Sequence, residues 1–174
     1  MNNGRRNTRE KGNTGQMLKK RTATKDYTLF EMSDIIERIA AVGVTSVATD
    51  YGTGEKYNPV EVHTLSHIAE HPGISVSEIA RDWGKTKGAV SQMIRKLSLQ
   101  GLVCKKKMDG NDKVTCLYVT EKGAELDKLH KIYDTSNYER FLKVLGERVT
   151  QEELMTAFKV MENWIELSLD WIPH

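Results

Sequence analysis

The 174-residue sequence has few of the residues that mark specialised classes of protein. It contains two cysteines, Cys104 and Cys116, and three prolines. Two cysteines are too few for a disulfide scaffold, and the low proline content excludes collagen-like and Pro-rich low-complexity chains. We expect both cysteines to be reduced thiols. The hydrophobic content of 39% is low for a soluble domain, so we expect one modest core and an oligomer that completes the burial of apolar faces.

Long apolar runs are absent as well. The longest uninterrupted stretches are a few residues, whereas roughly 20 are needed to span a bilayer. The basic, polar N-terminus also lacks the apolar stretch of a signal peptide. The sequence therefore predicts a cytoplasmic protein with no membrane partner.

The formal net charge of +2 conceals an uneven distribution along the chain. Residues 1–25 carry +7 and residues 84–113 carry +6, which leaves −11 for the remainder. Lysine and arginine can simply solubilise a helix face. An acidic body with two concentrated basic segments is nevertheless typical of a protein that meets a polyanion on one face.

Hydrophobic periodicity divides the chain into four parts. Residues 1–25 are polar and predict a disordered basic arm. Residues 26–57 predict a helix to about Val47 and then a connector. Residues 58–120 predict three short helices and a hairpin, and residues 121–174 predict further helices with a break near Gly146.

The three short helices have recognisable start signals. Asn58 precedes a first-position proline, Ser75 and Glu78 form a capping box, and Thr86 caps the third helix. A tight turn that contains Gly84 joins the last two helices, which is typical of a helix-turn-helix.

A hairpin is predicted next, and we call it the wing. Two strand-like runs, 102–107 and 114–119, flank a turn-rich segment around Gly110. If the hairpin turns symmetrically about Gly110, Cys104 and Cys116 face each other and can form a redox switch. The alternative is ordinary packing, the commoner fate of an unpaired cysteine.

The last predicted helix follows a second capping box, Thr150 with Glu153. Its apolar stripe is wide, and no later element is expected to cover it. We therefore expect it to be buried against another subunit. The stripe consists of Leu154, Ala157, Phe158, Met161, Trp164, Ile165, Leu169, Trp171 and Ile172.

The order of two helices, a basic helix and a basic hairpin, between long apolar-striped helices, resembles the MarR family of winged helix-turn-helix transcription regulators. The resemblance rests on residues 61–73 (EVHTLSHIAEHPG), 75–84 (SVSEIARDWG), 87–103 (KGAVSQMIRKLSLQGLV) and the wing's end at 119–123 (VTEKG). It implies a mostly α fold with a small β-hairpin wing, flanked by N- and C-terminal dimerisation helices. It also implies a homodimer on double-stranded DNA, with half-sites about one helical turn, roughly 34 Å, apart.

The resemblance makes the helix after Thr86 the recognition helix. Gln92 suits an adenine edge, and Arg95 suits a guanine or a phosphate. For Thr86, a purely structural role as helix cap stays open. The residues expected to face the major groove are Thr86, Lys87, Gly88, Ser91, Gln92 and Arg95.

The wing is expected to contact DNA through Lys105, Lys106, Lys107, Asn111 and Lys113. Family members often carry Asp-x-Arg near the wing tip, where this chain has Asn111 and Lys113. Because lysine lacks the planar guanidinium fork, phosphate neutralisation is favoured here over minor-groove reading.

The sequence thus predicts a DNA-binding transcription regulator, a repressor that a small-molecule effector releases from its operator. It predicts no enzyme activity and no cofactor, because no nucleophile–base pair or nucleotide fingerprint is found. Two alternatives stay open. One is a winged-helix module that docks another protein. The other is a metal sensor that uses His63 and His67, four residues apart on one helix face with His71 beyond, although surface histidines show the same spacing.

Overall fold

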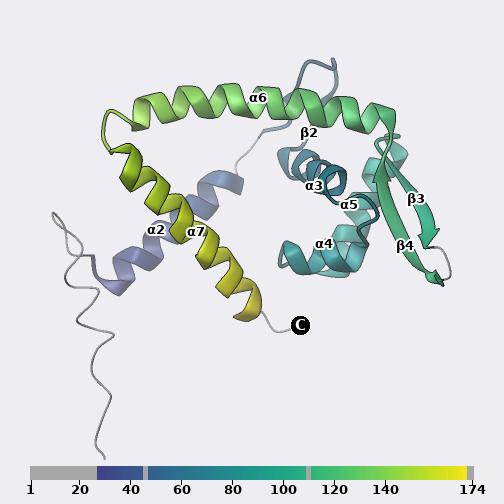
Figure 1. Cartoon of the computed structure of the whole chain (residues 1–174), viewed down its shortest axis with the longest axis horizontal. Coiled ribbons are helices and arrows are strands. Elements are labelled where there is room, and N and C mark those ends of the chain that lie inside the picture. The colour runs from purple at the N-terminus through teal and green to yellow at the C-terminus, as the bar shows by residue number, and fades with distance from the viewer. Residues whose placement is uncertain (1–26, 45–46, 109–110, 172–174) are drawn as a thin grey trace, which may run out of the picture. The chain divides into compact units, whose positions relative to one another are not determined.

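The computed structural model describes residues 27–44, 47–108 and 111–171 (Figure 1). The predicted arm, residues 1–25, lies outside the described residues. The chain divides into two units, 1–46 and 47–174. The helices are α2 (Leu29–Val44), α3 (Pro59–Glu70), α4 (Val76–Asp82), α5 (Lys87–Leu99), α6 (Glu121–Leu145) and α7 (Gln151–Trp171). The strands are β1 (Thr49–Asp50), β2 (Lys56–Tyr57), β3 (Val103–Met108) and β4 (Asn111–Val119).

The first unit contains α2, which begins later than the helix predicted from the sequence. A reciprocal pair of hydrogen bonds starts it: the backbone N–H of Glu31 donates to Thr28 Oγ1, and the backbone N–H of Thr28 donates to the Glu31 carboxylate. No residue of α2 is buried within its own unit. Its apolar side chains, Leu29 and Phe30 among them, are therefore available to another surface.

The connector predicted after the first helix contains a short hairpin, in which β1 pairs antiparallel with β2. The carboxylate of Asp50 holds its turn by accepting backbone N–H groups of Gly52, Thr53 and Gly54 at 2.8–3.1 Å. These hydrogen bonds lower the pKa of Asp50, and the one from Gly52 has the largest effect. The hairpin brings the buried Tyr57 into the core.

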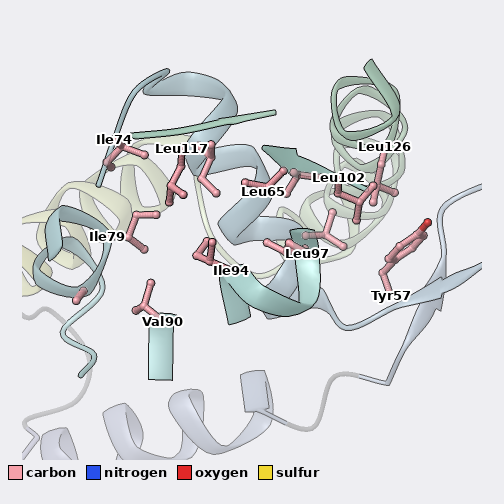
Figure 2. Close-up of a cluster of buried hydrophobic side chains, with 14 of the residues drawn as sticks. Tyr57, Leu65, Ile74, Ile79, Val90, Ile94, Leu97, Leu102, Leu117 and Leu126 are labelled. Carbon is pink, nitrogen blue, oxygen red and sulfur yellow. The ribbon is translucent and has the colours of Figure 1, made fainter. Parts of the chain in front are cut away.

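The core lies between α3, α4, α5, the β3–β4 hairpin and the first turns of α6 (Figure 2). Each helix contributes the apolar side chains that recur at three- and four-residue spacing. Burying one such side chain contributes roughly 1.5–3 kcal/mol. The fully buried members include Val62, Leu65, Ile68, Ile79, Val90, Ile94, Leu97, Leu102, Leu117 and Leu126.

The helix caps predicted from the sequence are confirmed. Asn58 accepts from the backbone N–H of Val60, and Ser75 with Glu78 forms the complete capping box. The Thr86 side chain accepts from the backbone N–H of Ala89. These bonds satisfy N–H groups that have no partner inside the helix, so they fix where α3, α4 and α5 begin.

A close contact joins the start of α6 to the turn before β3. Thr120 donates its backbone N–H to the carbonyl of Leu102 and its hydroxyl to the carbonyl of Gly101. Gly123, one turn into α6, packs directly on the Leu102 carbonyl: a Cβ at this position would lie 2.1 Å from that oxygen. The direction in which α6 leaves the winged domain therefore depends on glycine at position 123, which has no Cβ.

Helix α6 continues from β4, packs across α3 and leads into α7, which leaves from its far end (Figure 1). The predicted break is confirmed at Gly146, and the predicted capping box of Thr150 and Glu153 starts α7. No residue of α7 is buried within the chain. Among the described residues, no helix combines the length and apolar character that crossing a membrane requires.

Candidate nucleic-acid interface

Helices α4 and α5 form the helix-turn-helix that the sequence predicts. Gly84 follows α4 with φ +56°, a left-handed conformation that glycine adopts without strain. The turn is closed by a 2.8 Å hydrogen bond from the backbone N–H of Lys85 to the carbonyl of Ala80. Helix α5 can therefore begin immediately at Lys87, after its Thr86 cap.

The two faces of α5 differ sharply in burial. Val90, Ile94 and Leu97 are at most 1% exposed and hold the inner face in the core. All six residues predicted to face the major groove are on the opposite, exposed face: Thr86, Lys87, Gly88, Ser91, Gln92 and Arg95. The structure thus brings these six together on one surface, and their contact with DNA stays a prediction.

The basic residues of α5 are engaged unequally. Lys96 forms an ion pair with Glu61 of α3, with Nζ 2.6 Å from Oε1, and so fastens α5 to α3. Within the described part of the chain, neither Lys87 nor Arg95 pairs with a carboxylate. Their charges are not compensated by a carboxylate of the described residues, which makes them suitable partners for an anion.

The wing extends this basic surface. β4 pairs with β3 on one side and, on the other, bonds to the segment before α4, where Leu117 donates its N–H to the carbonyl of Ile74. Lys105, Lys106 and Lys107 are exposed on β3. The Lys106 ammonium lies 5.1 Å from the ring centroid of Tyr118. The side chains of Asn111 and Lys113, the other two predicted wing residues, lie outside the part that the structure describes.

The hypothesis that Cys104 and Cys116 face each other is wrong. An irregularity after Lys107 shifts the pairing, so Cys104 faces Tyr118 and Cys116 faces Lys106. The two cysteines are diagonal neighbours, a relation in which Cα atoms lie about 7–8 Å apart. A disulfide needs a shorter separation, so this pair cannot bridge without movement of the backbone.

The histidines predicted to share a face, His63 and His67, do not share a partner. His67 Nε2 lies 3.3 Å from a carboxylate oxygen of Asp82. His63 instead lies beside two residues of α6, His130 and Asp134. Burial lowers the pKa of His130, and the neighbouring Asp134 carboxylate acts in the opposite direction.

Comparisons with known proteins agree with this architecture. The chain is 29% identical over 124 residues to an uncharacterized HTH-type transcriptional regulator, YhjH, of Bacillus subtilis (strain 168), covering 71% of this chain and 69% of that protein. It is similar in fold to the crystal structure of MarR, with TM-score 0.60, 22% identity and coverage of 86% of this chain and 97% of that one. It is also similar to Streptococcus pneumoniae FabT in complex with DNA, with TM-score 0.56, 20% identity and coverage of 82% and 94%.

Residues 57–113, which contain α3, α4, α5 and β3, match the model of the MarR family. The mostly α fold of the chain, with its hairpin wing, is the MarR winged helix-turn-helix fold, as the resemblance implied.

Two residues of this chain, His130 and Asp134, escaped prediction from the sequence. They belong to α6, whereas the histidine spacing drew attention to α3 alone. The available signal was their own spacing of four residues, which places them on one helix face. That this face meets His63 depends on the packing of α6 across α3, which periodicity does not specify.

Proposed function

We propose that this protein is a MarR-family transcription regulator that binds double-stranded DNA sequence-specifically as a homodimer and represses transcription from a pseudo-palindromic operator in the cytoplasm. The observation that carries the proposal is the exposed face of α5, where Gln92 and the unpaired Lys87 and Arg95 stand together. Gln92 offers a donor and an acceptor to an adenine edge, and Arg95 offers two donors to a guanine edge.

The wing supplies the sequence-independent part of the proposed interface. Its exposed lysines would neutralise phosphates and release counterions, which makes affinity fall with salt. FabT and Lactococcus lactis ZitR, two proteins of similar fold, have been solved in complex with DNA. The similarity in fold to these two proteins supports the proposal that this chain docks on DNA. The positive charge of the proposed interface comes from this chain's own lysines and Arg95.

Lys106→Ala is expected to weaken binding to all DNA sequences similarly and to reduce the slope of log affinity against log salt by about 1. The reason is the loss of one phosphate contact. Binding is measured by fluorescence anisotropy on a mixed-sequence duplex at several salt concentrations. Lys143→Ala, which removes an equal charge near the C-terminal end of α6, is the matched control. Equal salt slopes for the two variants would place Lys106 outside the interface.

The proposed dimer rests on the apolar side chains that the chain leaves uncovered. On α7, Trp164 is 53% and Ile165 58% exposed although both belong to the predicted apolar stripe. Exposed stripes of this size mark interaction surfaces in soluble proteins. A second copy offers the same stripe, and two-fold symmetry makes a self-complementary contact the commonest solution.

Ile165→Glu is expected to convert the dimer to a monomer, because an unpaired carboxylate buried between apolar helices costs about 3 kcal/mol or more. This corresponds to a dissociation constant raised at least about 100-fold. Sedimentation velocity measures it, with Thr156→Glu on the polar side of α7 as control. A monomeric wild-type protein, or equal behaviour of the two variants, would remove α7 from the dimer interface.

In this proposal the dimer represses by occupying its operator. An effector relieves repression when it binds better to an arrangement in which the two recognition helices no longer match successive major grooves. The rival function, docking of another protein with incidental DNA contact, predicts affinity that is weak and independent of sequence. Selection of bound sequences from a randomised duplex library separates the two.

A further inference from the structure

We propose that His63, His130 and Asp134 form a binding site for a divalent transition-metal ion such as Zn²⁺. One ligand atom of each residue lies within 4.8 Å of the others. The residues come from two helices, His63 from α3 and both His130 and Asp134 from α6. Two imidazoles and a carboxylate are a donor set that zinc accepts in proteins.

The distances between the donor atoms suit such an ion. Asp134 Oδ2 lies 2.9 Å from His130 Nε2 and 3.6 Å from His63 Nε2. Bonds of about 2.0–2.1 Å in tetrahedral geometry separate two ligand atoms by roughly 3.3 Å. These two distances lie on either side of this value, and all three donor atoms lie within 4.8 Å of one another, so side-chain rotation can bring them to it.

The hydrogen bonding of His130 allows Nε2 to present a lone pair to the cluster. The Ser66 hydroxyl lies 3.1 Å from His130 Nδ1 and 3.2 Å from the carbonyl of Val62. When the hydroxyl donates to that carbonyl, Nδ1 donates to Ser66 and Nε2 presents its lone pair. A hydrogen bond from the second ring nitrogen commonly orients a metal-binding histidine in this way.

His130 Nε2 is the buried atom that ordinary protein contacts leave unsatisfied. The His130 side chain is 4% exposed, yet Nε2 makes no aligned hydrogen bond, although the Asp134 carboxylate is close. An imidazole lone pair beside a carboxylate oxygen is unfavourable unless a proton or a metal ion lies between them. This unsatisfied nitrogen is a separate reason, beyond proximity, to infer a ligand.

The cluster is accessible from solvent. The nearby Lys131 ammonium group does not neutralise its negative charge. The three residues line a pocket of about 370 Å³ that also includes Lys131. Lys131 is held at 3.0 Å by both Glu70 and Asp127, so its charge is already balanced. His63 is half-exposed at the pocket edge. An ion can therefore enter from solvent and keep a water as its fourth ligand.

The test uses the full chain, stripped with a chelator and without DNA. Zn²⁺ affinity is measured by competition with a chromogenic chelator, and Co²⁺ serves as a visible-absorption probe of four-coordinate geometry. One tight site per chain is expected. Because His130 is buried and its loss can perturb folding, the variants are His63→Gln and Asp134→Asn, with circular dichroism as the folding check.

Each ligand variant should lose more affinity than Ser66→Ala, for which a loss of roughly 10–100-fold is expected. His71→Gln, an exposed histidine outside the pocket, should bind as the wild type does. Unchanged affinity in both ligand variants would overturn the proposal. So would loss in His67→Gln without loss in Asp134→Asn, because this result would return the site to the His63–His67 pair. Since no DNA is present, either result leaves the proposed DNA-binding function standing.

Discussion

Gly123→Ala should lower the free energy of unfolding by about 3 kcal/mol, at the upper end of the usual cost of overpacking. A Cβ at this position would lie 2.1 Å from the carbonyl oxygen of Leu102. That oxygen accepts the backbone N–H of Thr120, so it cannot move without breaking the bond that starts α6. In thermal unfolding, followed by circular dichroism at one fixed protein concentration, the midpoint should fall by about 6–12 °C.

The matched control is Gly88→Ala, the same substitution in another helix. A Cβ at Gly88 would meet only Thr86 Oγ1, at 4.0 Å. Alanine is the better helix former, so this variant should be more stable than the wild type by up to about 1 kcal/mol. If Gly123→Ala proves as stable as Gly88→Ala, the contact between α6 and the turn before β3 does not fix the direction in which α6 leaves the winged domain.

Arg95→Ala and Gln92→Ala should each cost about 1–3 kcal/mol on the selected operator, a loss of about 5- to 150-fold, and relax the preference for particular bases. Both side chains are exposed and neither supports the core, so the fold should be unaffected. Affinity is measured on the operator and on duplexes with single base changes, at one stated salt concentration.

Arg140→Ala, which removes an exposed arginine from α6, is the control for charge alone. It should leave the relative affinities for the different duplexes unchanged. If Arg95→Ala and Gln92→Ala weaken binding equally on every duplex, these residues contribute no base reading and the assignment of α5 as a recognition helix is wrong.

Local signals in the sequence predicted the helices well. The caps at Asn58, Ser75 and Thr86 were readable because each satisfies backbone N–H groups within three residues of itself. The exposed face of α5 was equally readable, since burial in a helix follows a 3.6-residue period. Information of this kind needs no knowledge of the rest of the fold.

Features that depend on pairing between segments were not predicted. The register of the wing is set by the irregularity after Lys107, so assuming a symmetric turn misplaced Cys104 against Cys116. A one-residue change in the centre of a hairpin alters every cross-strand partner. The cluster of His63 with His130 and Asp134 likewise arises only because α6 packs across α3.

Selection of bound sequences from a randomised duplex library, at near-physiological salt, tests the central claim most directly. A dimer with two α5 helices in successive major grooves should enrich a pseudo-palindrome whose half-sites lie about one helical turn, roughly 34 Å, apart. No enrichment over the starting library would contradict sequence-specific binding and would favour a winged-helix module that docks another protein.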